Sequence, residues 1–191
     1  MPSTMTGFFL ALVACLAVEL PGRDGVRVAQ LAARLGPGAG LLAAIWASAM
    51  ATSVIAVFAA TLIGPAMPGP ARQMLLAFAL ALGALELALR RAPRAPEEPT
   101  RSTGAMLLVL LAAQLTDGAR LLLLALAIAT KAPLAVAAGG ALASGAVLTL
   151  AALAGAQWPA FLRQRPCRLA VAGVLLAFGI ITGLDARGLL G

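Results

Sequence analysis

Long apolar runs alternate with short breaks rich in glycine, proline and arginine along the whole chain. Each run approaches or exceeds the roughly 20 residues that an α-helix needs to cross the hydrocarbon core of a bilayer. The runs cover residues 7–34, 40–63, 73–89, 105–130, 133–155 and 169–184. This pattern predicts an all-α integral membrane protein with six transmembrane helices.

The first and fourth runs each contain a polar stretch near their middle. Residues 19–27 read ELPGRDGVR, and residues 114–120 read QLTDGAR. Proline removes a backbone donor and glycine relaxes the turn, so we expect the first helix to break at Pro21 and Gly22. Ionisable side chains within a span usually face the bundle interior or a wet cavity. Both stretches are therefore candidates for a functional site.

The composition agrees with a membrane protein. The chain is 62% hydrophobic and 11% charged, whereas soluble domains are about 45–50% apolar and about 25% charged. The net charge of +7, with no histidine, comes from basic residues between the apolar runs, so it indicates membrane loops rather than nucleic-acid binding. No nucleophile-with-base arrangement is present, so we expect neither an enzyme nor a tightly bound cofactor.

The two halves of the chain share several residues at a common spacing. Three pairs lie 96 positions apart: Pro37 and Pro133, Ser48 and Ser144, Ser53 and Thr149. Glu19 and Gln114 lie 95 apart, whereas the alternative match of Asp24 with Asp117 has a spacing of 93 and stays open. Because three spans per half is an odd number, the second half would be inverted. We predict a first three-helix repeat over residues 1–89, a cytoplasmic linker over residues 90–103, and a second repeat over residues 104–191.

Basic residues predict the orientation in the membrane. The loops after the first, third and fifth spans carry eight arginines, and the other side carries three basic residues. The positive-inside rule then places the linker in the cytoplasm and both termini outside it, in a cell (inner) membrane. Glu86 lies four residues before Arg90, so we expect these two to form an ion pair at the membrane interface.

A carboxylate near the middle of the membrane has two natural uses. Ionised, it offers oxygen ligands to a hard cation such as Ca²⁺ or Mn²⁺. Shielded from water, it can take up a proton instead, so one group can couple cation movement to proton movement. Glu19 and Asp117 are the first candidates for this role. The other candidate metal ligands are Gln114, Asp24 and Thr116, and the other residues expected to line the site are Arg23, Arg120, Ser48, Thr52 and Ser144.

These motif residues resemble the transmembrane-protein-165 or Gdt-one family, which are proposed manganese and calcium exchangers coupled to protons. The signature of that family is Glu-x-Gly-Asp-(Lys/Arg)-(Thr/Ser), once per inverted three-helix repeat. Residues 113–130 align with the second copy, and residues 19–34 align with the first. The resemblance implies six spans in two inverted repeats, with a cation site at the midplane between the two motif helices.

Both copies of the signature depart from the family pattern. The first keeps Glu19 and Arg23, but Gly22 stands at the aspartate position. The second keeps Asp117, but Gln114 stands at the glutamate position. Three guanidinium groups also lie in or near the motifs, and positive charges there oppose the binding of a divalent cation. They belong to Arg23, Arg27 and Arg120.

Three functions remain open on these grounds. The first is exchange of manganese or calcium for protons. The second is a carrier of the same fold for an anionic or small amphipathic solute, which the arginines within the spans favour. The third is a non-transporting scaffold or partner subunit, in which each acid pairs with an arginine as a clamp between helices. The expected partners are the lipid bilayer, a small cation and protons, and the sequence leaves open whether the chain forms a homo-oligomer.

Overall fold

The computed structural model describes residues 2–89, 102–158 and 165–189, with the backbone alone for Pro2 and Ser3. Within these ranges every regular element is a helix. The elements are α1 (Pro2–Glu19), α2 (Arg23–Leu35), α3 (Ala39–Ile63), η1 (Gly64–Ala66), α4 (Gly69–Leu89), α5 (Thr103–Leu115), α6 (Gly118–Thr130), α7 (Pro133–Ala154), η2 (Gly155–Gln157) and α9 (Arg165–Ala186). The predicted all-helical class is therefore correct. Residues 90–101, most of the predicted linker, lie outside the described residues.

Four continuous helical segments in the described part of the chain are long and apolar enough to cross a membrane. Two bent pairs qualify as one span each, α1 with α2 and α5 with α6, which bend by 64° and 61°. The structure thus has four to six candidate crossings, in agreement with a multi-pass membrane protein. The last helix, α9, covers 22 residues and is longer than the predicted span at 169–184, because its arginine-containing first turn is helical.

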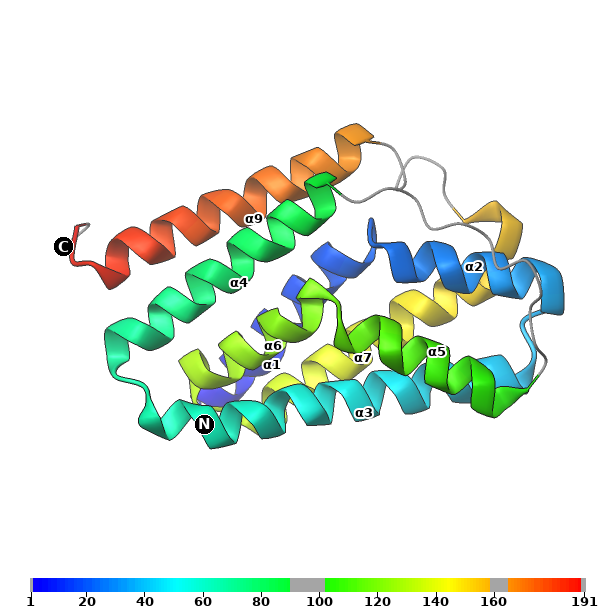
Figure 1. Cartoon of the computed structure of the whole chain (residues 1–191), viewed down its shortest axis with the longest axis horizontal. Coiled ribbons are helices and arrows are strands. Elements are labelled where there is room, and N and C mark those ends of the chain that lie inside the picture. The colour runs from blue at the N-terminus through cyan, green and yellow to red at the C-terminus, as the bar shows by residue number, and fades with distance from the viewer. Residues whose placement is uncertain (1, 90–101, 159–164, 190–191) are drawn as a thin grey trace.

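Helices α3 and α7 contact each other, and between them they contact both bent pairs (Figure 1). Helix α7 packs against α1, α2 and α6, while α3 packs against α5 and α6. Helices α4 and α9 run side by side at one edge, and α4 joins this pair to α6 (Figure 1). Both bent pairs are therefore held against the central α3 and α7.

Small residues explain why α7 packs so closely. A Cβ atom added at Gly139 would collide with the backbone carbonyl oxygen of Phe8 in α1. One added at Gly140 would lie 2.5 Å from the Leu123 side chain of α6. Because lipid offers little driving force for burying apolar side chains, close backbone approach of this kind holds membrane helices together. The small residues of α7 thus position α1 and α6 around it.

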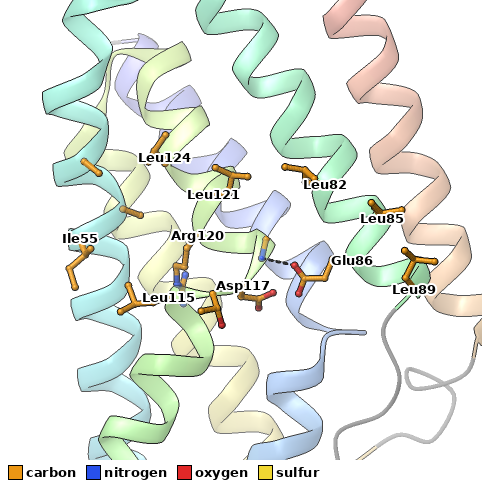
Figure 2. Close-up of a pocket in the computed structure, with 14 residues that line it drawn as sticks. Ile55, Leu82, Leu85, Glu86, Leu89, Leu115, Asp117, Arg120, Leu121 and Leu124 are labelled. Carbon is orange, nitrogen blue, oxygen red and sulfur yellow. Dashed lines mark hydrogen bonds between the residues drawn. The ribbon is translucent and has the colours of Figure 1, made fainter.

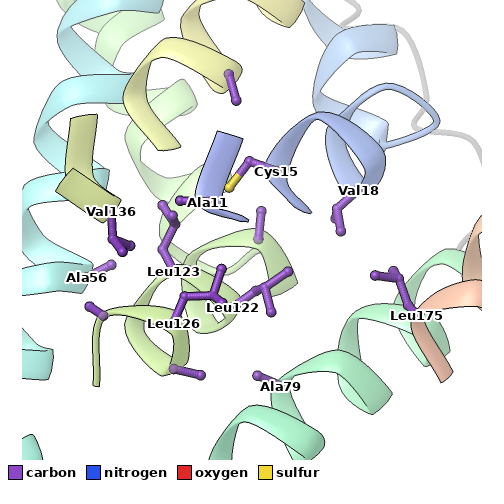
Figure 3. Packing of buried hydrophobic residues seen from close by; sticks show 14 of the residues in the cluster. Ala11, Cys15, Val18, Ala56, Ala79, Leu122, Leu123, Leu126, Val136 and Leu175 are labelled. Atoms are coloured by element: carbon purple, nitrogen blue, oxygen red, sulfur yellow. The ribbon is translucent and has the colours of Figure 1, made fainter. Parts of the chain in front are cut away.

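Buried apolar side chains form two clusters. The first cluster draws on α1, α4, α6 and α9 with the last turns of α3 and the first half of α7; Figure 3 shows it around Leu122, Leu123 and Leu126 of α6. The second draws on α2, α5, the start of α3 and the second half of α7. Each broken pair therefore contributes one helix to each cluster.

Candidate functional site

The first break follows directly from its sequence. Helix α1 ends at Glu19, and Pro21 two residues later has no N–H to continue the helical bonding. Gly22 adopts an extended backbone, with φ −69° and ψ 167°, and precedes the first residue of α2. Its N–H donates to the carbonyl oxygen of Glu19 at 3.0 Å. The break thus leaves the Glu19 side chain at the end of a helix inside the bundle.

The second break lies between α5 and α6, at Thr116 and Asp117. Asp117 has an extended backbone (φ −91°, ψ 145°) at the start of α6, and its side chain makes no capping bond. The N–H of Gly118 instead donates to Glu86 Oε2 of α4 at 2.7 Å (Figure 2). A carboxylate suits this position because the first N–H groups of a helix lack partners and carry partial positive charge.

The two breaks face each other. Arg23, at the start of α2, directs its Nη2 atom to the carbonyl oxygen of Ala113 at 3.5 Å and to Thr116 Oγ1 at 3.3 Å. Both acceptors lie in the last turn of α5 or directly after it. A guanidinium at a helix C-terminus is favourable because the last carbonyl groups carry partial negative charge. Arg23 therefore links the two motif stretches.

Six polar side chains form what we call the buried polar cluster. None of them is more than 5% exposed. They come from α1, α3, α5, α6 and α7, and five of them were singled out from the sequence as site candidates beside Glu19. The members are Glu19, Ser48, Thr52, Gln114, Arg120 and Ser144.

Arg120 is the centre of this cluster. Its Nη2 atom lies 2.9 Å from Gln114 Oε1, 2.9 Å from Ser144 Oγ and 3.5 Å from Glu19 Oε1. Ser144 in turn donates its hydroxyl proton to Glu19 Oε1 at 2.5 Å. Glu19 is therefore held by one guanidinium and one hydroxyl group, each from a different helix.

Gln114 connects the other half of the cluster. Its amide nitrogen donates to Ser48 Oγ at 3.0 Å, and Ser48 donates onward to the carbonyl oxygen of Ile45 at 2.9 Å. Thr52 Oγ1 lies 2.9 Å from Gln114 Oε1 and 2.8 Å from the carbonyl oxygen of Ser48, so its single proton can serve either acceptor. These contacts fix the amide of Gln114 with its oxygen toward Arg120.

Several buried atoms of the cluster have no hydrogen-bond partner among the described residues. They are Glu19 Oε2, Arg120 Nε and Arg120 Nη1. Buried polar groups in proteins are nearly always hydrogen-bonded, so unpartnered ones indicate a missing partner or a second arrangement. Here one carboxylate oxygen and two guanidinium nitrogen atoms lack partners within a single ion pair.

Asp24 makes its ion pairs with residues outside the buried polar cluster. It is 4% exposed, and its Oδ1 atom lies 3.3 Å from Arg27 Nη1 and 3.8 Å from Arg23 Nε. Its Oδ2 atom has no partner among the described residues. Because both arginines belong to α2, these ion pairs lie within one helix and do not join two helices.

Asp117 lies at a pocket of about 680 Å³ between α3, α4 and the second break (Figure 2). Thr116, Glu86 and Arg120 also line this pocket, and the rest of its wall is apolar. Glu19 is not among the lining residues. Arg120 therefore stands between Glu19 on one side and the pocket with Asp117 on the other.

Two further observations bear on the predicted metal ligands. Among the described residues, no group of three or more histidine, cysteine, aspartate or glutamate side chains is arranged to hold a metal ion. The oxygen atoms around Arg120 come instead from one carboxylate, one amide and one hydroxyl group. Sequence reasoning missed the contact of Glu86 with the second motif, because it depends on α4 packing against α6.

A comparison with protein families adds the evidence that decides the assignment. Residues 102–189 match the family described as "Divalent cation/proton antiporter GDT1". This match places the second half of the chain in the GDT1 family. It confirms the resemblance found from the motif residues and covers the second half, with α5, α6, α7 and α9. No curated protein and no solved structure matches the chain.

The GDT1 family consists of transporters, not enzymes, and its antiporters work in membranes on divalent cations and protons. The helices of the chain agree with that class, since the described residues provide four candidate spans, or six if each bent pair is one span. The second break and three members of the buried polar cluster, Gln114, Arg120 and Ser144, lie within the matched region.

Proposed function

We propose that this chain exchanges a divalent cation, Mn²⁺ or Ca²⁺, for protons, and that Glu19 is the exchanging carboxylate. The observation that carries the proposal is the buried polar cluster, where the ends of two broken helices bring together oxygen atoms from separate helices. Hard cations prefer such oxygen ligands. Glu19 would bind the cation when ionised and carry a proton after release.

The position of the cluster along the helices supports a site at the membrane midplane. In α3, Ser48 and Thr52 lie between residues of the second apolar cluster, such as Ile45, and residues of the first, such as Ala56. In α7, Ser144 lies between Ala143 of the first cluster and Val147 of the second. Discontinuous helices with a central polar site are typical of secondary transporters.

Matched contacts in the two halves support the inverted repeat. Glu19 bonds to Ser144, and Gln114 bonds to Ser48. Glu19 and Gln114 are 95 positions apart, and Ser48 and Ser144 are 96 apart. Each broken helix thus contacts the serine of the other half, as a two-fold relation between repeats would require. These contacts favour the 95-residue spacing over the 93-residue alternative.

The remaining predicted ligands take outer positions in this proposal. Asp117 and Thr116 line the pocket beside Arg120, where they would attract a cation on its way to Glu19. Asp24 is held by Arg23 and Arg27, and it would act on the site through these arginines. Ser48, Thr52 and Ser144 supply neutral oxygen atoms in the interior.

The test is transport in proteoliposomes that contain the purified protein. An outward proton gradient should drive Mn²⁺ or Ca²⁺ uptake, and because protons leave as the cation enters, uptake should make the lumen more alkaline. Glu19→Gln should abolish uptake and Asp117→Asn should reduce it. Asp185→Asn is the matched control, because Asp185 is an exposed acid that bonds to Gln73 in α4. Full uptake by Glu19→Gln would reject the proposal.

A second candidate function rests on the arginines. The unpartnered N–H groups of Arg120 are donors that an anion could accept from. A carrier of an anionic solute would then show proton-driven uptake that Mn²⁺ and Ca²⁺ do not affect, and Arg120→Gln would be inactive. The cation exchanger should instead take up Mn²⁺ or Ca²⁺, so the same proteoliposomes distinguish the two functions.

A further inference from the structure

One terminal nitrogen of Arg120 occupies a place that suits a bound cation. Its Nη2 atom is surrounded by oxygen atoms of Gln114, Ser144 and Glu19 at 2.9, 2.9 and 3.5 Å. These oxygens come from α5, α7 and α1, so three separate helices converge on one positive group. A hard cation needs the same convergence of oxygen ligands.

The negative charge of Glu19 is already neutralised by the guanidinium of Arg120. Glu19 and Arg120 are 5% and 4% exposed, and their charges oppose each other. A divalent cation that approaches Glu19 meets a guanidinium already paired with the same oxygen atom. Two positive groups cannot share one carboxylate in a medium of low dielectric without strong repulsion. Cation binding at Glu19 therefore requires that Arg120 leaves it.

The structure also offers Arg120 a place to move to. Arg120 lines the pocket of about 680 Å³ that contains Asp117 and Glu86 (Figure 2). Its Nε and Nη1 atoms have no partner among the described residues in the present position. A guanidinium with two unpartnered nitrogen atoms gives up fewer hydrogen bonds when it turns toward the acidic side of the pocket.

We infer that Arg120 is a tethered cation that competes with the transported ion for Glu19 and thereby sets the cation affinity of the carrier. This inference rests on the proposed role of Glu19 as the exchanging carboxylate. When the divalent cation binds, the guanidinium turns toward Asp117 and Glu86. When the cation leaves, Arg120 returns and neutralises Glu19. Arg120 thus controls how tightly the cation binds, and Gln114 and Ser144 contact the guanidinium and the cation in turn.

The test measures binding rather than transport. Purified protein in detergent is titrated with MnCl₂ or CaCl₂, and cation binding is read by calorimetry and by the rise in melting temperature. Arg120→Gln should lower the Kd for Mn²⁺ or Ca²⁺ at least about tenfold, because a competing charge is removed. Arg120→Lys keeps a charge but lacks the planar fork, so it should give a smaller decrease. Arg72→Gln is the matched control. It removes one positive charge, as Arg120→Gln does, but from a residue that donates to the carbonyl oxygen of Met67.

Each variant gives a result that either supports or overturns the competition between Arg120 and the cation. Arg120→Gln leaves Glu19 buried without its counter-ion and so destabilises the fold, whereas Arg120→Lys retains the pair. Tighter cation binding in Arg120→Lys, and in Arg120→Gln where it folds, supports the inference. Adding Glu19→Gln to either variant should remove the increase in cation affinity. Unchanged or weaker binding in Arg120→Lys overturns it. Wild-type protein that binds cations but transports none would reject the proposed function and leave the competition by Arg120 standing.

Discussion

At the scale of single residues, Ser144 is the neutral side chain of the buried polar cluster that contacts both of its charged members. It donates to Glu19 and accepts from Arg120, so it stabilises both members of a buried ion pair. Ser48 occupies the matching position in α3 but contacts only the neutral amide of Gln114 and a backbone carbonyl. The two serines therefore differ in the charge of their partners rather than in their burial.

This difference predicts unequal effects of the same substitution. Ser144→Ala should lower the free energy of unfolding by about 1.5–3 kcal/mol, because hydrogen bonds to charged groups contribute more than neutral ones. Ser48→Ala should cost about 1 kcal/mol. Unfolding of the purified protein in mixed micelles, followed by circular dichroism, measures both. Equal costs would show that the charges of Glu19 and Arg120 are not what Ser144 stabilises.

The sequence predicted the members of this cluster better than their contacts. Glu19, Gln114 and Arg120 stood out because polar side chains within apolar spans are costly, and the shared spacing of Ser48 and Ser144 pointed to a repeat. Which acid pairs with Arg120 depends on how α1 crosses α6 and α7, and no local pattern carries that information. The role of Asp117 in binding stays a prediction.

At the scale of elements, the N-terminus of α6 depends on a side chain from another helix. Gly118 donates to Glu86, so Glu86→Ala should lower the free energy of unfolding by about 1–2 kcal/mol through loss of this cap. Glu86→Gln keeps an acceptor oxygen and should cost less. The micelle unfolding assay measures both variants. A larger cost for glutamine than for alanine would contradict the capping role.

The tight packing of α7 gives a second prediction for an element. Gly139→Ala should lower the free energy of unfolding by about 1–3 kcal/mol, because the added methyl group collides with the backbone of α1 near Phe8. Gly173→Ala in α9 is the matched control, since nothing lies within 4 Å of the added Cβ atom. It should be neutral or slightly stabilising, because alanine is the better helix former. Equal effects at both glycines would contradict this packing.

Element boundaries were predicted where the sequence has strong local signals. Pro21 and Gly22 ended α1 as expected, and Pro133 begins α7, where its missing N–H is tolerated. The cap from Glu86 was missed because the sequence offered a nearer partner, Arg90, which lies outside the described residues. Contacts between distant elements thus account for most of what the sequence left open.

At the scale of the whole molecule, the orientation in the membrane remains a prediction from the basic residues. If both bent pairs cross the membrane, the number of spans is even and both termini lie on the same side. Alkaline phosphatase fused to the C-terminus should then be active in bacterial cells, and green fluorescent protein at the same place should be dark. The opposite pattern would reverse the predicted orientation without changing the fold.

The contrast between α7 and α9 has a consequence for how freely the chain can vary. The most hydrophobic part of α7 is 56% buried, whereas that of α9 is only 17% buried. A saturation mutagenesis library selected for stable protein should therefore accept almost any aliphatic or aromatic replacement on the outer face of α9. In α7 it should retain little besides glycine, alanine and serine where α1 and α6 touch it. Relatives of this chain would then diverge fastest along their last helix.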